Sequence, residues 1–255
     1  MFFDLDFHKM LWAYFIESPY HIELFKQHGK NIKNCIPIGY AVFDEFEKIK
    51  SEYENIEKEH RITILWAPHH TINEDSGLKQ SGFLELANYF MQISKEYSDS
   101  IKIIFRPHPI LKQNLYLHKD WGKEKTDEYY NYWESIPNGE LSDGGNYIYD
   151  FLKSDILIHD CGSFMSEYLY TLKPAIYYSR EEKYYSQLNE IGKEAFNAHY
   201  IAYSQKEIEE NVFSLIEGHD PKFAEREDFK KKYLKFNNSN ISQRIFSFLN
   251  NQLEK

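Results

Sequence analysis

The chain has 255 residues, of which 42% are apolar and 27% charged, and its formal net charge at neutral pH is −10. This length and balance suit one large globular domain, or one domain with a fragment of another. The acidic balance argues against a general nucleic-acid binder, so no nucleic-acid partner is expected.

No apolar run approaches the roughly 18 residues of a transmembrane helix. The first ten residues, MFFDLDFHKM, carry acids where a secretory signal needs bases. Cys35 and Cys161 lie far apart without framework spacing, which favours a reducing compartment. We therefore expect a cytoplasmic protein. The lysine run at 230–232 fits a solvated helix face, with peripheral contact to the inner face of the membrane as the alternative.

The first 60 residues predict two short strands between helical segments. An opening helix precedes the strand AYFIES (13–18), and a helix from about Pro19 to His28 precedes the strand NCIPIGY (34–40). The segment 41–60 is charged and helical, and it resembles a connector.

From residue 61 onward, strand and helix patterns alternate. Strands are predicted at 61–68, 101–105, 155–160, 173–179 and 198–204. Helices are predicted at 81–98, 127–136, 163–172, 205–217, 221–236 and 240–253, with a turn at 137–140. This alternation predicts an α/β fold in which a Rossmann-like, mostly parallel sheet has helices on both faces.

Three of the predicted strands end in polar residues. The segments are ILWAPHH (64–70), IIFRPHP (103–109) and ILIHDCGS (156–163). Ligands of such sheets bind beyond the carboxyl ends of the strands. The three strand ends therefore predict one shared site.

Arg106 and His108 flank Pro107, which fixes the backbone between them. A guanidinium is a planar fork that suits phosphate oxygens, and a nearby histidine can donate to an anion or protonate a leaving group. The alternative is that Arg106 pairs with a local acid and His108 caps a turn. We favour a functional role because Arg-Pro-His-Pro is a costly way to end a buried strand.

His69 and His70 follow the first of these strands in the same way, and either could reach a phosphate. The alternative is a pair of surface histidines in a loop. A metal site is not expected, because the histidines, Asp160 and Cys161 show none of the usual ligand spacings. No flanking motif supports Cys161 as a nucleophile.

At the third strand end, Gly162 allows close approach of the backbone and Ser163 is a favourable N-cap. Free N–H groups at such a helix start would hold a phosphate. Glu167, one turn further on, could accept hydrogen bonds from ribose hydroxyls. The alternative is an ordinary capped helix with an acid in its first turns.

These segments, in this order and separation, resemble the C-terminal half of the CDP-glycerol glycerophosphotransferases. Those are the teichoic-acid and capsule polymerases, which have a GT-B fold. SDILIHDCGSFMSEYLYTLKPAIYY (154–178) carries the third motif, and IPIGYAVFDEF (36–46) resembles the segment that opens the second lobe. FIESPYHIELFKQHG (15–29) resembles the end of the first lobe, so the resemblance covers about residues 12–250.

The resemblance implies a division into three parts. Residues 1–40 would be a remnant of the first GT-B lobe, 41–60 a connector, and 61–255 a nucleotide-binding Rossmann-like domain with C-terminal helices. Because little of the first lobe is present, we expect a fragment or one part of a split enzyme. A partner lobe or a second copy of the chain would complete it.

The resemblance also implies the reaction: transfer of glycerol phosphate from CDP-glycerol to a polymer or lipid-linked acceptor, with no other cofactor. The chain departs from the family pattern at Thr71, where an arginine is usual, and at Gly162, where a serine is usual. The alternatives are a nucleotide-sugar glycosyltransferase of GT-B type and a non-catalytic nucleotide-binding module. The candidate catalytic residues are His108 and His70, and the candidate substrate-binding residues are His69, Arg106, Gly162, Ser163 and Glu167.

Overall fold

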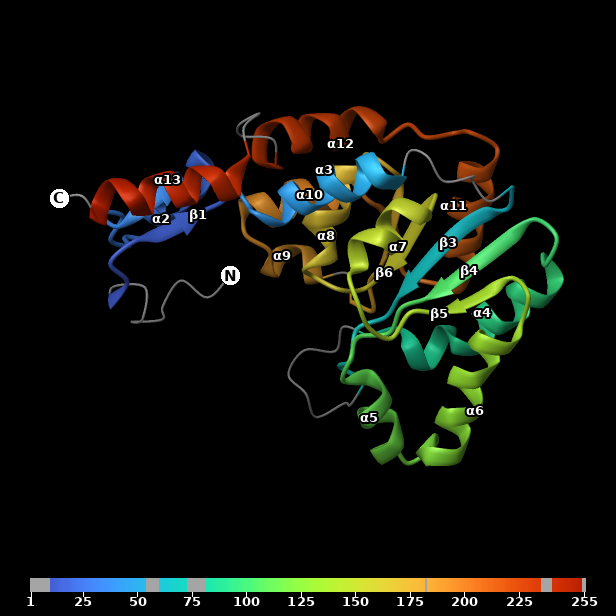
Figure 1. Ribbon diagram of the computed structural model, residues 1–255. Helices are drawn as coiled ribbons and strands as arrows, with labels where there is room; N and C mark the ends of the chain where they lie inside the picture. The colour runs from blue at the N-terminus through green and yellow to red at the C-terminus, as the bar shows by residue number, and fades with distance from the viewer. Residues whose placement is uncertain (1–9, 54–59, 73–80, 182, 235–239, 254–255) are drawn as a thin grey trace. The chain divides into compact units, whose positions relative to one another are not determined.

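The computed structural model describes residues 10–53, 60–72, 81–181, 183–234 and 240–253 (Figure 1). The chain forms two compact units, one of residues 1–55 with 227–255 and one of residues 56–226. The C-terminal helices were expected in the same domain as the large sheet, but residues 227–255 group with the N-terminal segment instead. The helix expected before residue 10 lies outside the described residues.

The larger unit contains a six-stranded, fully parallel sheet with the order β5-β4-β3-β6-β7-β8. Its strands are β3 (Ile62–Ala67), β4 (Ile101–Phe105), β5 (Gly139–Leu141), β6 (Ile156–His159), β7 (Ala175–Tyr178) and β8 (Tyr200–Ala202). The order reverses between β3 and β6. In a sheet of this kind, that switch point opens a crevice beyond the carboxyl ends of the two strands.

Helices cover both faces of this sheet, as expected (Figure 1). One face packs against α4 (Phe83–Glu96), α6 (Gly122–Ser135) and α11 (Gln205–Ile216). The other carries α7 (Tyr147–Lys153), the short α8 (Phe164–Glu167) with the 3-10 turn η1 (Tyr168–Thr171), and α10 (Glu190–Asn197). The unit also contains α5 (Leu111–Leu117) and α9 (Tyr184–Gln187). It ends at Arg226, within α12 (Phe223–Phe229), and the π-helical turn η2 (Lys230–Leu234) extends α12.

The central strands are buried on both faces, which is why they read as continuous apolar runs rather than alternating ones. Leu65 and Ile104 point to one face and are fully buried, while Trp66 and Phe105 are buried in the opposite core. The Trp66 ring stacks on Phe90 of α4 with ring centroids 4.0 Å apart. This aromatic contact fixes α4 against β3 and so helps to hold the strand end that carries the first polar segment.

The smaller unit is built on two short parallel strands, β1 (Tyr14–Ile16) and β2 (Cys35–Pro37). Its helices are α2 (Pro19–Gln27), α3 (Val42–Tyr53) and α13 (Ile241–Leu253). The Asp44 carboxylate accepts hydrogen bonds from the backbone N–H groups of Ile241 and Ser242, at 2.9 and 2.6 Å. Burial opposes ionisation there, yet these bonds keep the pKa of Asp44 below its usual value. Asp44 thereby caps α13 and ties the two ends of the unit together.

Two predicted elements differ from the structure. Residues 137–140, predicted as a turn, contribute to the edge strand β5. The predicted helix at 163–172 is only one α-helical turn followed by a 3-10 turn, and it ends at Leu172 with φ of 65°. Pro174 follows two residues later, and a proline shortly after a left-handed residue is a common way to end a helix.

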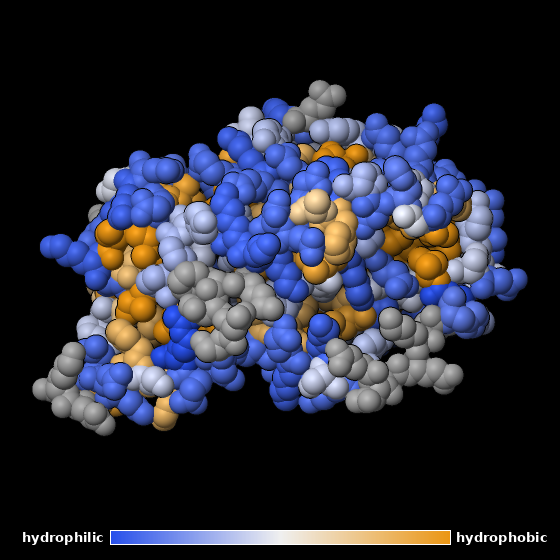
Figure 2. Space-filling model, turned by 90° about the horizontal axis from the view of Figure 1, so that it is seen from above, coloured by the Kyte–Doolittle hydropathy of each residue, from blue (hydrophilic) through white to orange (hydrophobic). Residues whose placement is uncertain are grey.

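The described helices include none that is both long and apolar enough to cross a membrane. The face shown in Figure 2 is largely hydrophilic, with apolar side chains gathered in separate patches. That pattern is ordinary for a chain with 27% charged residues.

Candidate active site

The polar segments after β3 and β4 lie side by side because the parallel ladder continues past both strands. Trp66 pairs with Phe105 inside the sheet. Beyond it, Arg106 N–H donates to the carbonyl of Trp66 at 2.8 Å, and His108 N–H donates to the carbonyl of Pro68 at 3.1 Å. The same register sets His108 opposite His69.

The side chains of His69, His70 and His108 form one cluster. Ring centroids are 4.1 Å apart for His69 and His70, 4.2 Å for His70 and His108, and 5.2 Å for His69 and His108. Asn114 of α5 holds the backbone of this segment by donating to the carbonyl of His70 at 2.9 Å. The structure therefore brings together all three histidines that the sequence proposed for the site.

The three imidazoles favour the neutral state. Burial, reinforced by the neighbouring imidazoles, lowers the pKa of His69 to about 4. Burial also lowers the pKa of His70, and burial together with His70 lowers that of His108. Nδ1 of His108 accepts from the N–H of Ile110 at 3.3 Å, so neutral His108 carries its proton on Nε2. In that tautomer it can donate a hydrogen bond from Nε2.

Asp160, at the end of β6, fixes the backbone of this cluster. One carboxylate oxygen accepts from His69 N–H at 2.5 Å, and the other accepts from Gly82 N–H at 2.7 Å. Burial raises the pKa of Asp160 to about 7, although these two backbone bonds oppose that shift. Asp160 thus joins β6 to the segment after β3 and to the start of α4. Its position in the third polar segment was the only sequence signal for this role.

Beyond the carboxyl ends of β3, β4 and β6 lies a pocket of about 410 Å³. Three of the sequence-proposed residues line it: Arg106, His108 and Ser163. The full lining is Ala67, Pro68, Arg106, Pro107, His108, Pro109, Ser142, Asp143, Gly144, Gly145, Tyr147, Cys161, Ser163 and Phe164. The volume falls within the usual range for small-molecule sites.

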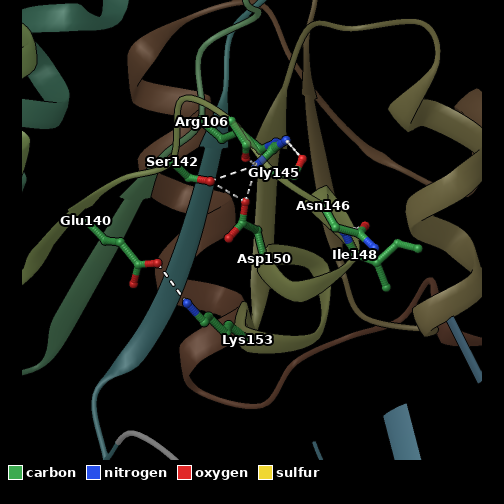
Figure 3. Close-up of polar contacts among 9 residues, drawn as sticks. Arg106, Glu140, Ser142, Gly145, Asn146, Ile148, Asp150 and Lys153 are labelled. Carbon is green, nitrogen blue, oxygen red and sulfur yellow. Dashed lines mark hydrogen bonds and ion pairs between the residues drawn. The ribbon is translucent and has the colours of Figure 1, made fainter. Parts of the chain in front are cut away.

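Arg106 forms the local ion pair that the sequence left open as an alternative (Figure 3). Its Nη1 donates to the Asp150 carboxylate at 2.6 Å and to the Ser142 hydroxyl at 2.7 Å. The same guanidinium reaches the carbonyls of Gly144 at 3.2 Å and Gly145 at 3.3 Å. Its planar fork is thus engaged in holding the segment between β5 and α7.

The loop Ser142–Gly145 is the part of the pocket that the sequence analysis did not predict. It follows β5, whose residues were read as a turn, so the segment SDGG had no strand before it to mark it as a strand end. Gly145 has φ of 66°, a left-handed conformation that favours glycine. Asp143 and Tyr147 complete this wall of the pocket.

The third polar segment differs in detail from its predicted geometry. Ser163 precedes α8, but its hydroxyl makes no capping bond and lies 3.1 Å from Cys161 Sγ. A Cβ on Gly162 would meet only the Tyr184 hydroxyl, at 3.7 Å, so the fold itself does not require glycine there. Glu167 is the last residue of α8 and is not among the residues that line the pocket.

A six-stranded parallel sheet with helices on both faces and a pocket at its switch point defines a Rossmann-like fold. The profile of the CDP-glycerol:poly(glycerophosphate) glycerophosphotransferase family matches residues 12–251. The chain belongs to that family, which confirms the resemblance. No curated protein sequence matches the chain.

Solved structures agree in fold. The wall teichoic acid polymerase TagF in a CDPG-soaked variant superposes with a TM-score of 0.66 and 18% identity, over 95% of this chain and 58% of that one. A second structure of TagF gives a TM-score of 0.64, again over 58% of its length. UDP-GlcNAc 2-epimerase from Neisseria meningitidis gives 0.58 at 15% identity, over 93% of this chain and 60% of that one. The chain thus has the second-lobe architecture of a GT-B fold and spans less than two thirds of these proteins.

Proposed function

We propose that this chain forms the nucleotide-binding part of a transferase that passes glycerol phosphate from CDP-glycerol to a teichoic-acid or capsule polymer. The observation that carries the proposal is membership of residues 12–251 in the glycerophosphotransferase family, combined with a pocket of about 410 Å³ at the switch point. Parallel sheets bind ligands at that edge.

In the proposed reaction, an acceptor hydroxyl oxygen bonds to the phosphorus that carries glycerol. The bond from that phosphorus to the bridging oxygen breaks, its electron pair leaves with CMP, and the hydroxyl proton passes to a base. Negative charge on the phosphate oxygens must be stabilised during the transfer, so fixed hydrogen-bond donors around them lower the barrier.

His108 is the residue best suited to act on the leaving phosphate. It lines the pocket, and its tautomer presents an N–H from Nε2. His70 contacts it and is the second candidate catalytic group. Arg106 acts on the donor indirectly, by donating hydrogen bonds to the Ser142 hydroxyl and the Gly145 carbonyl and so fixing the loop Ser142–Gly145. The remaining candidate donor-binding residues are His69, Gly162, Ser163 and Glu167.

The proposed acceptor is a polymer or a lipid-linked primer at the inner face of the cell membrane. Contact with such a surface would use exposed basic groups such as Lys231. The smaller unit, with its two-stranded sheet, corresponds to the end of a first GT-B lobe. A partner lobe or a second copy of the chain would then supply the acceptor side.

A ligand panel tests this proposal. Titration calorimetry and thermal shift with CDP-glycerol, CDP-ribitol, CMP, UDP and UDP-sugars should give the tightest binding for a cytidine diphosphate. A His108→Ala chain should lose roughly 1.5 to 3 kcal/mol of that binding, the scale of a charge-assisted hydrogen bond. Preference for uridine nucleotides would instead support a nucleotide-sugar glycosyltransferase, and no nucleotide binding at all would contradict both.

A further inference from the structure

Asp143 gives the pocket an acidic group. Among the described residues that line the pocket, it is the one that carries a carboxylate. We infer that Asp143 selects the nucleobase of the donor: its carboxylate accepts a hydrogen bond from the exocyclic amino group of cytosine. The inference deepens the proposed function and rests on it, because it concerns how the same pocket distinguishes cytidine from uridine nucleotides.

The carboxylate of Asp143 is available to a ligand. The side chain is exposed, and none of the described residues forms a hydrogen bond or an ion pair with it. The guanidinium of Arg106, which lines the same pocket, is paired with Asp150 at 2.6 Å instead. Asp143 therefore keeps hydrogen-bonding capacity that a bound donor can use.

The charge of Asp143 restricts the part of the donor that it can face. A carboxylate close to a pyrophosphate is repelled, because both are negative and a pocket screens charges less than bulk water does. The phosphate end of the donor is already assigned to His108. Asp143 must therefore face groups that donate hydrogen bonds. In CDP-glycerol these groups are the amino group of cytosine, the hydroxyls of ribose and the hydroxyls of glycerol.

The surroundings of Asp143 favour the base among these three. Tyr147 belongs to the same wall of the pocket, and Phe164 also lines the pocket, with its ring centroid 5.4 Å from that of Tyr147. Aromatic rings offer flat faces on which a base can stack, whereas hydroxyl groups do not need them. A Cβ at Gly144 would meet nothing within 4 Å, so a flat ring can approach the backbone next to Asp143.

The backbone that carries Asp143 is fixed on both sides. Arg106 donates to the Ser142 hydroxyl at 2.7 Å and to the Gly144 carbonyl at 3.2 Å, and these two residues directly precede and follow Asp143. An acceptor on a fixed backbone loses little conformational freedom when it binds, and it cannot move far to suit a different base. Its position therefore contributes to selectivity as well as to affinity.

Cytosine and uracil differ at the position that the carboxylate contacts in this arrangement. Cytosine carries an amino group there, which donates hydrogen bonds, and carboxylates pair with this group in base recognition. Uracil carries a carbonyl oxygen at the same position. In the same pose, that oxygen would lie against the carboxylate, so two acceptors would meet with no proton between them. Asp143 thus rejects uracil as well as attracting cytosine.

The test is a set of calorimetric titrations of the full chain with CMP, UMP and 2′-deoxy-CMP. None of these probes contains glycerol, so glycerol hydroxyls cannot cause a difference among them. We expect CMP to bind roughly tenfold more tightly than UMP, or better. In Asp143→Asn, the side-chain amide can present either its oxygen or its NH₂ group to the base, so the ratio should fall to about threefold or less, chiefly through tighter binding of UMP.

Two further variants support the measurement. Asp143→Ala should also lower the ratio, by weakening the binding of CMP, and it replaces Asp143→Asn if circular dichroism shows that the amide variant does not fold. Asp120 is exposed and does not line the pocket, so Asp120→Asn is the matched control and should leave the ratio unchanged. The loss of affinity from CMP to 2′-deoxy-CMP should be the same in Asp143→Asn as in the unmodified chain.

The outcomes separate the inference from the proposed function. A preference for CMP that persists in both Asp143 variants would overturn the inference and leave the proposed function intact. So would an Asp143→Asn chain that no longer distinguishes CMP from 2′-deoxy-CMP, because the carboxylate would then bind ribose. Preference of the unmodified chain for UMP, or no nucleotide binding at all, would contradict the proposed function and the inference with it.

Discussion

At the scale of single residues, Arg106 lines the pocket while its guanidinium is bonded to Asp150 and to the loop Ser142–Gly145. The guanidinium is 14% exposed and its ion-pair partner Asp150 6%. A buried pair of this kind is costly to break, because one charge is left without its partner. The sequence indicated that Arg106 lies near the site, but not which way its guanidinium points. Asp150 is 44 positions away, in α7.

Substituting Arg106 and Asp150 shows whether Arg106 contacts the nucleotide itself or acts on it through the loop. If Arg106 holds the loop, Asp150→Asn should weaken nucleotide binding about as much as Arg106→Ala, by roughly 1.5 to 3 kcal/mol. The double variant should then be no worse than either single one. Titration calorimetry with CMP measures this. Tighter binding in Asp150→Asn would mean that the released guanidinium reaches the nucleotide itself.

His199 offers a pH prediction that does not involve the pocket. It is fully buried, and its Nδ1 donates to the carbonyl of Ala195 at 2.8 Å. Burial is the main cause that lowers its pKa to about 4, from an unfolded value near 6.5. Because the pKa of His199 is lower in the folded than in the unfolded chain, the contribution of neutral His199 to stability is complete above pH 6.5. It is lost as the pH falls from 6.5 towards 4, with an upper limit on the order of 3 kcal/mol.

His199→Asn keeps an amide donor for Ala195 and removes the titration. Between pH 7 and pH 4.5, the free energy of unfolding should therefore fall less in His199→Asn than in the unmodified chain. Urea unfolding can be followed by tryptophan fluorescence, because Trp66, Trp121 and Trp133 lie in this unit and only Trp12 lies in the other. The exposed His219→Asn serves as the control and should change nothing. An unaltered pH slope in His199→Asn would contradict the assignment.

At the scale of elements, the sequence predicted most of the parallel sheet and missed its edge. β3, β4, β6 and β7 are buried on both faces, and burial of that kind leaves long apolar runs that are easy to read. β5 has three partly exposed residues, and its glycine suggested a turn. Once β5 was missed, the loop that follows it could not be recognised as a strand end. A site formed by several strand ends can be predicted in full only if every one of those strands is predicted.

The loop Ser142–Gly145 allows a matched test of backbone geometry. Gly144 and Gly145 both have open space where a Cβ would stand, but only Gly145 has a positive φ, at 66°. Gly145→Ala should cost about 1 to 2 kcal/mol of stability and weaken CMP binding, because the left-handed conformation is unfavourable for alanine. Gly144→Ala should be close to neutral in both measurements, which are urea unfolding and calorimetry. Equal effects of the two substitutions would contradict a conformational cause.

At the scale of the whole molecule, the two units differ in how far the sequence predicted them. The larger unit follows from strand and helix periodicity. The smaller one joins residues 1–55 to 227–255, a pairing between chain ends that periodicity does not encode. Its contacts are specific all the same. Phe248 of α13 packs against Phe15 with ring centroids 5.5 Å apart and against Trp12 at 6.0 Å, although Trp12 remains 65% exposed.

We expect the 255-residue chain by itself to bind nucleotide without sustained transfer. In the described part of the smaller unit the sheet has two strands of three residues each, whereas a complete Rossmann-like lobe needs well over about 100 residues. An acceptor hydroxyl held from one side gains little of the proximity and orientation that account for much of such catalysis. The chain would be incubated with CDP-glycerol and a lipid-linked glycerol-phosphate primer, and CMP release would be measured against a His108→Ala control. Release at no more than the control rate, from a chain that binds CMP, is the expected result. Sustained, primer-dependent release that disappears in His108→Ala would establish instead that these residues suffice for the whole reaction.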